Sequence, residues 1–598
     1  MDIEHTCEAT VASPPITNPG ESRNDTYCSK RRGAATFLRS IAFFSELDAA
    51  SIVELAAHCD EVELPGGLLL FTEGDSSDAL YIVRSGMLGA YTSSATGPTL
   101  LGTIGVGEIV GEMGLITQRP RGATVRALRD SVVLRIPQQQ FHALVAGHPA
   151  AMMKSLSVAI TRLQSDGSAN RSAPHTFALL PHDDSVDAIA LARQFRAALT
   201  PHGCCAVIDA ATGSGRDCEW FAALEDDYRF VIYVADGNDA DWRLFCARQA
   251  DAFILPVRAR QTPTPWPEGC ILSTDTAPSR PRHLVLLHDG DVSAGSASDW
   301  LAHVGGARHH HVRTPADIAR IARLMIGRGI GLVLSGGGAR GFAHLGVARA
   351  LREAGKPIDY VGGTSIGAIV GAVIAADWSY QEAMEKLRRT FVDGKPLKDY
   401  TLPFVSMTRG HRVSRLLQNE FGALDIRDLP ISFFAVSTNL TQGSESVCCD
   451  GPLWLALRAS SAIPGVLPPL LRDGEVFVDG AVLDNFPVVP MRRLGVTDII
   501  GVDIGTENTL RAQIDEHALP SWWCVAYGRM RSPRSRPGLL RILLRPGMLN
   551  AEVANATRRA QTSLLLTPPV RDVDLLDWSA FDKAVDAGYR YTCERLCA

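Results

Sequence analysis

The sequence lacks any hydrophobic run long enough to cross a bilayer as a helix, which takes about 20 apolar residues. The longest candidate, residues 366–376, is short and broken by glycine. The first residues do not form a basic region followed by an apolar one, so a secretory signal is not expected. The 13 cysteines include no Cys-x-x-Cys pair, which argues against a zinc site or a disulfide framework. We therefore expect a cytoplasmic protein.

The chain also has no large excess of either charge. It carries 59 Lys and Arg against 65 Asp and Glu, a net charge of -6 over 598 residues, so a nucleic-acid partner is not expected. The apolar share of 46% and the charged share of 21% are those of an ordinary globular protein. A chain of this length predicts about three to five domains.

Changes in residue pattern along the chain predict these domains. Near the N-terminus, short β-branched runs alternate with glycine turns, which is typical of a small antiparallel barrel. Two later regions alternate apolar strands with amphipathic helices, the pattern of α/β domains. The predicted fold class is multidomain α/β with an N-terminal β-barrel. Its parts are a disordered lead at 1–35, the β-barrel at 36–165, a middle α/β domain at 175–325, a second α/β domain with a mostly parallel central sheet at 328–505, and the C-terminal extension of that domain at 506–598.

Two glycine motifs follow predicted strands of the second α/β domain. They read Ser335-Gly336-Gly337-Gly338-Ala339-Arg340-Gly341 and Gly363-Thr364-Ser365-Ile366-Gly367. In Gly-x-Ser-x-Gly the serine occupies a sharp turn, and a Cβ on either glycine would collide with the adjacent elements. The glycine-rich loop can offer backbone N–H groups to the oxygen of a tetrahedral intermediate. Together the motifs indicate a serine hydrolase.

The first motif also fits Gly-x-Gly-x-x-Gly, so a dinucleotide site has to be weighed. Such a site places an acidic residue at the end of the second strand, where it binds the ribose. Here Asp359 precedes that strand and Ser365 follows it. The pattern therefore disfavours a dinucleotide.

A third motif, Val478-Asp479-Gly480-Ala481, ends another predicted strand and is followed by Asp484-Asn485-Phe486-Pro487-Val488. With the glycine motifs and the run 459–465, it resembles the patatin-like phospholipases. The resemblance implies that Ser365 is the nucleophile and that Asp479 is its general base and acid. It also implies an oxyanion hole made by the loop residues Gly336, Gly337, Gly338, Arg340 and Gly341. For Asp484 we favour a role as a turn or cap residue.

A histidine triad is the competing mechanism. His344 falls on the predicted helix after the glycine loop and His411 in a connecting region, and neither belongs to a telling motif. We expect no metal site either, because the adjacent His309, His310 and His311 would point in different directions on a strand or a helix. No catalytic cofactor is expected.

The N-terminal barrel resembles a cyclic nucleotide-binding domain, through Glu73-Gly74-Asp75, Ser85-Gly86, Gly111-Glu112-Met113-Gly114-Leu115 and Arg119-Pro120-Arg121-Gly122-Ala123-Thr124-Val125. The resemblance implies that Glu112 binds the ribose hydroxyl and Arg121 the cyclic phosphate, with Gly111, Ala123 and Thr124 in the same site. Gly122 stands where a threonine would favour the guanine nucleotide, so cAMP is the candidate regulatory ligand. Without a phosphate, we expect Arg121 to be left unpaired.

The order of these domains resembles the neuropathy target esterase family. That resemblance implies lysophospholipase-type hydrolysis, with a phospholipid or lysophospholipid as substrate. The alternative is a nucleotide-responsive interaction protein with an inactive hydrolase fold. The middle domain has Pro181-His182-Asp183-Asp184 where a phosphate loop needs glycine, so we interpret it as a spacer or coupling domain. Residues 522–545 combine tryptophan, arginine and leucine, which predicts either peripheral contact with a membrane or a surface loop and helix packed on the hydrolase domain.

Overall fold

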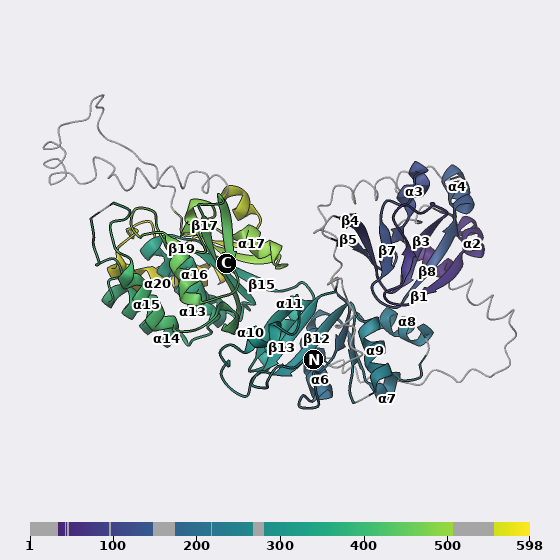
Figure 1. The fold of residues 1–598 in the computed structure, drawn as a ribbon, viewed down its shortest axis with the longest axis horizontal. Coiled ribbons are helices and arrows are strands. Elements are labelled where there is room, and N and C mark those ends of the chain that lie inside the picture. Colours follow the sequence, from purple (N-terminus) through teal and green to yellow (C-terminus); the bar gives the residue numbers. More distant parts are fainter. Residues whose placement is uncertain are drawn as a thin grey trace, which may run out of the picture. The chain divides into compact units, whose positions relative to one another are not determined.

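The computed structural model describes residues 34–41, 44, 47–94, 97–147, 174–216, 218–237, 239–266, 280–402, 404–505 and 555–597. The chain divides into two compact units, Met1–Ser172 and Ala173–Ala598 (Figure 1). The predicted membrane segment at 522–545 and most of the predicted disordered lead lie outside the described residues. Ala34 and Ala35, which we assigned to that lead, begin a helix over residues 34–40.

The N-terminal unit contains two four-stranded antiparallel sheets. Its strands are β1 Asp60–Leu64, β2 Leu69–Phe71, β3 Ala79–Ser85, β4 Leu88–Ser94, β5 Gly97–Ile104, β6 Ile109–Val110, β7 Thr124–Ala127 and β8 Ser131–Pro137, and its helices include α2 Ala49–Ala57, α3 Glu112–Thr117 and α4 Gln138–Gly147. The strand orders are β1-β8-β3-β6 and β2-β7-β4-β5. Leu80, Ile82 and Ile136 are fully buried between strands and helices. The predicted antiparallel β-domain at the N-terminus is confirmed.

The first part of the second unit is a parallel α/β sheet. Its elements are β9 Thr176–Leu179, α6 Ala188–Leu199, β10 Cys205–Ile208, α7 Ala210–Gly213, α8 Cys218–Asp227, β11 Phe230–Val234, α9 Ala240–Gln249, β12 Ala252–Arg258, β13 Arg282–Leu287, α10 Ser296–Leu301, β14 Arg308–Val312 and α11 Pro315–Met325. The strand order is β10-β11-β9-β12-β13-β14. All five residues of β11 are buried, as expected for a parallel sheet covered by helices.

The second part of this unit is an eight-stranded sheet. Its elements are β15 Ile330–Leu334, α12 Ala343–Glu353, β16 Tyr360–Thr364, α13 Ile366–Ala375, α14 Tyr380–Leu387, α15 His411–Phe421, β17 Ser432–Asn439, β18 Ser444–Cys448, α16 Leu453–Ser460, β19 Leu470–Arg472, β20 Glu475–Asp479, α17 Val488–Arg493, β21 Asp498–Val502, β22 Leu564–Leu566 and α20 Phe581–Cys597. The order is β19-β20-β17-β16-β15-β21-β22, with β18 also paired to β17. Strands β18, β19 and β20 pair antiparallel and the others parallel. The mostly parallel sheet is as predicted.

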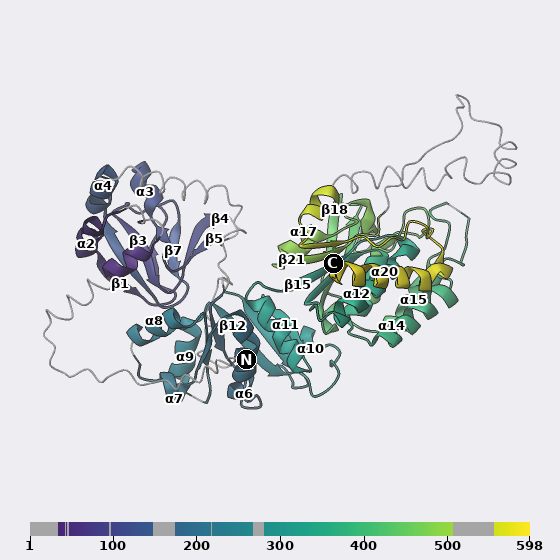
Figure 2. The same cartoon turned by 180° about the vertical axis from the view of Figure 1, so that it is seen from behind.

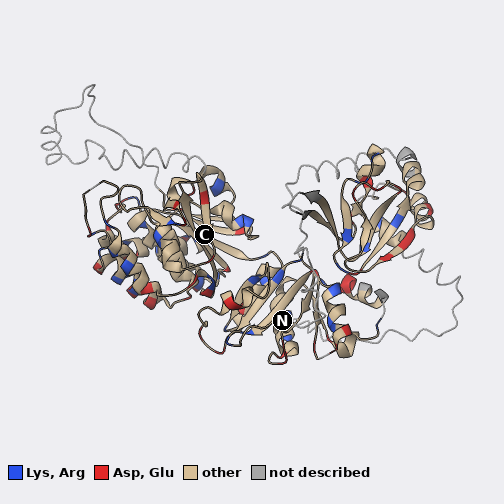
Figure 3. Cartoon of the chain, in the orientation of Figure 1, with Lys and Arg blue, Asp and Glu red and all other residues tan. Residues whose placement is uncertain are grey.

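Charged residues are excluded from the centre of this sheet. β15, β16 and β17 contain none, whereas charges gather on the surrounding helices and loops (Figure 3). A charge buried between sheet and helices would have to be paired to avoid a large desolvation penalty. The middle of the sheet is therefore a rigid apolar support for the residues at its strand ends.

Residues 555–597 complete the sheet and its helical cover. β22 pairs in parallel with β21 at the edge, and α20 runs beside α12 (Figure 2). A Cβ on Gly346 of α12 would collide with the Val585 carbonyl, and a Cβ on Gly588 of α20 would collide with the Ala343 carbonyl. This close helix pair therefore depends on glycine on both sides.

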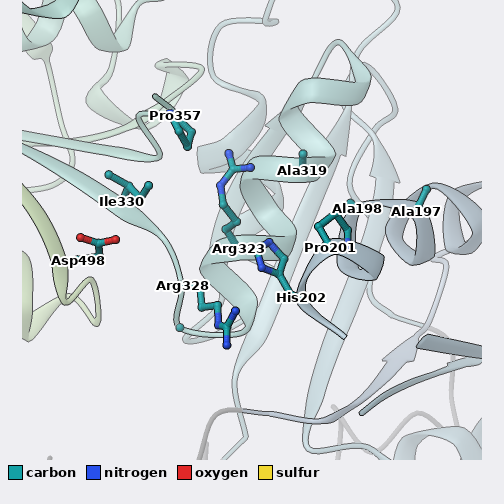
Figure 4. Close-up of a pocket in the computed structure, with 11 residues that line it drawn as sticks. Ala197, Ala198, Pro201, His202, Ala319, Arg323, Arg328, Ile330, Pro357 and Asp498 are labelled. Carbon is teal, nitrogen blue, oxygen red and sulfur yellow. The ribbon is translucent and has the colours of Figure 1, made fainter. Parts of the chain in front are cut away.

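Polar contacts also join the two sheets of the second unit. Arg323 of α11 donates to both oxygens of the buried Asp359 carboxylate, at 2.9 and 2.6 Å. A cavity of about 790 Å³ lies beside this ion pair, lined by His202, Arg323, Arg328 and Asp498 together with apolar side chains (Figure 4). None of its lining residues is a predicted catalytic or nucleotide-binding residue. Across the described helices, none combines the length and the hydropathy of a membrane span.

Candidate functional site

Ser365 sits in a strained turn between β16 and α13. Its backbone has φ 58° and ψ -125°, a left-handed conformation that is costly for a residue other than glycine. A Cβ on Gly363 would lie 2.5 Å from the Gly367 carbonyl, and a Cβ on Gly367 would collide with the Leu334 carbonyl. The two glycines therefore allow the strand, the turn and the helix to pack this closely.

Asp479, at the end of β20, lies next to this serine. The Ser365 hydroxyl donates to Asp479 Oδ2 at 2.7 Å, and the Ala481 N–H donates to Oδ1 at 2.9 Å. Burial raises the pKa of Asp479 to about 6, although both hydrogen bonds oppose the shift. The group is thus ionised at neutral pH and more basic than an ordinary aspartate.

The glycine-rich loop passes directly beside the serine. A Cβ on Gly336 would lie 3.2 Å from Ser365 Cβ. The Gly336 N–H donates to the Asn485 carbonyl at 3.2 Å, and the Asn485 side chain donates back to the Gly336 carbonyl at 3.3 Å. No acceptor is recorded for the N–H groups of Gly337 and Gly338 in the described ranges, which leaves these two as the available donors.

The other two residues of the predicted oxyanion loop make packing contacts. A Cβ on Gly341 would collide with Ile366, the residue after the serine. Arg340 donates through Nε to the Val573 carbonyl at 2.7 Å. The Ala339 N–H donates to the Leu575 carbonyl at 2.8 Å. The glycine-rich loop is therefore fixed by hydrogen bonds to the segment that precedes α20.

Three further residues position the pair and were not singled out from the sequence. The Ser365 N–H donates to Ser460 Oγ at 2.9 Å, and Ser460 Oγ donates to the Val436 carbonyl at 2.6 Å. The Asp479 N–H donates to the Ala462 carbonyl at 3.0 Å. Thr364 donates through its hydroxyl to the Asp484 carbonyl at 2.9 Å. The run 459–465 resembles a segment of the patatin-like phospholipases, but nothing in its sequence distinguishes Ser460 from Ser461.

Asp484 makes the turn that its sequence position predicted, and also an ion pair. Its Oδ1 accepts from the Phe486 N–H at 3.0 Å and lies 3.2 Å from Arg558. Burial raises the pKa of Asp484 to about 7, although Arg558 opposes the shift. Arg558 belongs to the part of the chain that returns to the sheet after residue 554.

The two histidines of the competing triad have other surroundings. His344 is fully buried, its Nε2 lies 2.8 Å from the Ser335 carbonyl oxygen, and burial lowers its pKa to about 4. His411 is exposed at the start of α15. No hydrogen bond from either ring to Ser365 or Asp479 is recorded among the described residues.

The three adjacent histidines lie on β14 and alternate between its faces. His310 Nε2 is 3.0 Å from His283 Nδ1, and His311 Nδ1 is 2.9 Å from His288 Nε2. His311 Nε2 lies 2.7 Å from the Arg427 carbonyl oxygen, so this ring contacts the second sheet region. Burial is the main cause that lowers the pKa of His311 to about 3. No cluster of three potential metal ligands occurs in the described ranges.

In the N-terminal unit, Gly111, Glu112 and Arg121 gather around α3. Gly111 has φ 91° and is the N-cap residue of the helix, and Glu112 is buried. Arg121 donates to Asp78 Oδ1, the Gly111 carbonyl and the Ala79 carbonyl at 3.1, 3.1 and 2.8 Å. The expectation that Arg121 would be unpaired without a phosphate is therefore wrong, because backbone carbonyls and Asp78 supply its partners.

The remaining two predicted nucleotide-site residues lead into β7. Thr124 accepts the Glu73 N–H through Oγ1 at 3.0 Å, which ties the two predicted motif segments together. Ala123 directly precedes it on the chain. All five predicted residues thus belong to one region of the N-terminal unit, although they are separated along the chain.

Known family models match three regions of the chain. They are a patatin-like phospholipase over residues 332–492, a cyclic nucleotide-binding domain over 61–148 and a Neuropathy Target Esterase family P-loop like domain over 175–328. The chain therefore combines a domain of the patatin-like phospholipase class with a cyclic nucleotide-binding domain. An uncharacterized NTE family protein of Mycobacterium tuberculosis is 31% identical over 587 residues, which cover 94% of this chain and 96% of that protein. The chain belongs to the neuropathy target esterase family, as the sequence motifs indicated.

Other relatives are much longer. Lysophospholipase NTE1 of Cryptococcus neoformans is 31% identical over 555 residues, 79% of this chain and 34% of that protein. Human patatin-like phospholipase domain-containing protein 6 is 28% identical over 609 residues, 89% of this chain and 44% of that protein. The chain thus spans less than half the length of these relatives. Similar solved structures include the regulatory domain of Toxoplasma gondii PKA with cAMP, with a TM-score of 0.21, 24% identity and coverage of 23% of this chain and 52% of that one.

Proposed function

We propose that this chain hydrolyses the acyl ester of a phospholipid or lysophospholipid through a dyad of Ser365 and Asp479. The observation that carries the proposal is the 2.7 Å hydrogen bond from the Ser365 hydroxyl to a buried carboxylate. A nucleophile bonded directly to a base is the arrangement that serine catalysis requires. No cofactor is needed for this chemistry, and the described residues include no catalytic histidine contact to either group.

The reaction runs in two halves. Asp479 accepts the hydroxyl proton while Ser365 Oγ attacks the acyl carbon, and then returns the proton to the leaving alcohol oxygen of the lipid. A water molecule next attacks the acyl-serine, again giving a proton to Asp479, and the fatty acid leaves as Ser365 Oγ regains a proton. A base with a pKa near the working pH suits both transfers, and that of Asp479 is raised to about 6.

Negative charge on the carbonyl oxygen needs donors during each half. We assign the N–H groups of Gly337 and Gly338 to this role, with Gly336, Arg340 and Gly341 holding the loop in shape. The N-terminus of α13 adds its favourable dipole next to the serine. Each such donor lowers the barrier by roughly 3 to 4 kcal/mol in comparable sites.

The test is hydrolysis of lysophosphatidylcholine and of a soluble aryl ester by the purified chain and its Ser365→Ala variant. We expect both activities in the wild type and neither in the variant. Ser461→Ala is the matched control, because Ser461 Oγ donates within its own helix to the Leu457 carbonyl. Equal inactivity of wild type and variant on every ester would instead favour the interaction protein with an inactive hydrolase fold.

We further propose that a cyclic nucleotide, with cAMP as the candidate, binds the N-terminal unit and regulates hydrolysis. Gly111, Glu112, Arg121, Ala123 and Thr124 are the proposed contacts. The cyclic phosphate has to compete with Asp78 for Arg121, which predicts modest affinity. Calorimetric titration with cAMP should give binding that Arg121→Ala removes and Arg126→Ala keeps. Binding to wild type and Arg121→Ala alike would overturn the assignment.

Two further expectations from the sequence remain predictions. One is the set of domain boundaries near residues 36, 165, 175, 325, 328 and 505. The other is the cytoplasmic location with peripheral membrane contact. Eight cysteines of the described residues are free thiols, which supports a reducing compartment.

A further inference from the structure

One loop of the second α/β region exposes a cluster of large apolar side chains. Of the 13 such side chains that are exposed in the described part of the chain, five lie between residues 400 and 407. They are Tyr400, Leu402, Phe404, Val405 and Met407, and Phe404 is 90% exposed. We call residues 400–402 and 404–407 the apolar loop. Clustered exposure of this kind marks an interaction surface, whereas single exposed apolar residues are ordinary.

The base of the apolar loop is fixed by hydrogen bonds. Tyr400 and Thr408 form a β-bridge, and the Thr401 N–H donates to the Met407 carbonyl at 3.0 Å. The buried Ser406 hydroxyl donates to the Thr408 carbonyl at 2.6 Å. Exposure of the apolar side chains is therefore imposed by a defined backbone.

The apolar loop is connected directly to the catalytic pair. The N–H groups of Met407 and Thr408 donate to the carbonyls of Gly465 and Val466 at 2.9 and 3.1 Å. The same short segment, residues 460–466, contacts Ser365 through Ser460 and Asp479 through Ala462 at its other end. A surface bound to this loop would therefore lie near the ester-cleaving groups.

Basic residues border the apolar loop. Residues 393–412 contain four Lys or Arg and two Asp. Lys395, Lys398 and Arg409 are exposed, and no carboxylate partner is recorded for them in the described ranges. One of the two acids, Asp399, accepts the Arg412 N–H at 3.0 Å. Apolar side chains beside unpaired cations match the acyl and headgroup layers of an anionic membrane.

We propose that the apolar loop inserts into a phospholipid surface and holds the Ser365–Asp479 site against it. This inference rests on the proposed function, because it assigns the source of the lipid substrate. A second copy of the chain is the rival occupant, but the unpaired cations at the rim would then face like charges across a symmetric contact.

Binding is tested in the Ser365→Ala background, so that no lipid is consumed. Vesicles of equimolar phosphatidylcholine and phosphatidylglycerol are sedimented with the full chain, with and without Leu402→Ser plus Phe404→Ser. We expect the double substitution to weaken binding by about tenfold or more, since each large apolar side chain loses its burial in lipid. Val53→Ser plus Val106→Ser is the matched control, because these side chains are 60% and 50% exposed on the N-terminal unit. Binding should be unchanged in this control.

Two results would overturn the proposal. One is vesicle binding that the loop substitutions leave unchanged. The other is a dimer in sedimentation velocity that dissociates on loop substitution while vesicle binding persists. Hydrolysis of a soluble aryl ester by the wild type reports separately on the proposed function. If that assay shows no hydrolysis while vesicle binding depends on the loop, the proposed hydrolase function is wrong and the membrane-binding role of the apolar loop stands.

Discussion

The role proposed for Asp479 makes two conflicting demands on its carboxylate. A general base has to be ionised to accept a proton from Ser365, yet Asp479 is buried, and two hydrogen-bond donors of the described residues compensate its charge. Because the charged form is the active one, hydrolysis of a soluble ester should rise as pH increases through about 6 and level off above it. A pH–rate profile of kcat/KM measures this. A profile centred near 4 would mean that Asp479 is not the titrating base.

The same carboxylate should lower stability at neutral pH. The pKa of Asp479 is raised from 3.8 to about 6 in the folded state, so the folded protein binds a proton more tightly than the unfolded chain does. Stability is then lost as pH rises between these two values, by about 3 kcal/mol in total. Asp479→Asn should therefore abolish activity while raising the free energy of unfolding at pH 7. Denaturant unfolding at pH 7 and pH 4 checks this. A gain in the free energy of unfolding of Asp479→Asn that is equal at both pH values would contradict it.

Ser460 should act on catalysis through the backbone of Ser365. Removing its hydroxyl leaves the buried Ser365 N–H without its acceptor, a loss of about 1 to 3 kcal/mol. We expect Ser460→Ala to lower kcat by roughly ten- to a hundredfold with little change in KM on a soluble ester, because the strained turn relaxes. Ser461→Ala should leave kcat near the wild-type value. A rise in KM alone would assign Ser460 to substrate binding.

At this scale the local sequence marks the two residues of the proposed dyad but not the residues around them. Ser365 directly follows β16 and Asp479 ends β20, and both belong to glycine motifs. Ser460 works through one side-chain contact across 95 residues of sequence, and an identical neighbour follows it. The pairing of Arg121 was mispredicted because backbone carbonyls of Gly111 and Ala79 leave no sequence signature.

Among the elements, the α12–α20 pair is joined to the glycine-rich loop, because α12 begins directly after that loop. Gly346→Ala would place a Cβ against the Val585 carbonyl. We expect the helices to move apart, with a loss of about 1 to 3 kcal/mol in the free energy of unfolding. Thermal unfolding measures the effect, and Gly290→Ala is the control because its Cβ would meet nothing within 4 Å. Equal melting temperatures would show that the pair tolerates a wider spacing.

Some elements of the two sheets have no apolar sequence pattern by which they could be predicted. β14 reads Arg-His-His-His-Val, and its histidines pack against other histidines, so no hydrophobic period reveals the strand. β19 and β22 are three-residue edge strands that exist only because β20 and β21 are there to pair with them. The central strands β11, β15 and β17 instead contain continuous apolar runs, which mark buried parallel strands.

For the second unit as a whole, one buried ion pair should dominate the link between its two sheets. Arg323→Ala would leave the fully enclosed Asp359 without its counter-charge, at a cost of about 3 to 5 kcal/mol. Arg313→Ala breaks a parallel but more exposed pair with Asp377 and should cost less than about 1 kcal/mol. Denaturant unfolding of the two variants compares them directly. Similar losses of unfolding free energy in the two variants would show that the Arg323–Asp359 pair does not dominate the link between the two sheets.

The order of domains along the chain was readable because each has its own residue pattern, and the family models agree with that order. The interpretation of the middle domain as a spacer or coupling domain stays a prediction. Its first strand leads into His182, which packs between Trp266 and Trp300 at 5.0 Å from each ring. These contacts form only after the sheet has folded and are therefore invisible in the linear sequence.

The strand and helix that close the second sheet have a consequence for synthesis on the ribosome. Ser365 and Asp479 emerge well before Val573 and Leu575, whose carbonyls hold the glycine loop from behind. β22 and α20 follow the rest of the sheet by more than 50 residues of chain. A nascent chain therefore carries the proposed nucleophile and base beside an unsupported glycine loop, and we expect it to gain esterase activity only after α20 has been released.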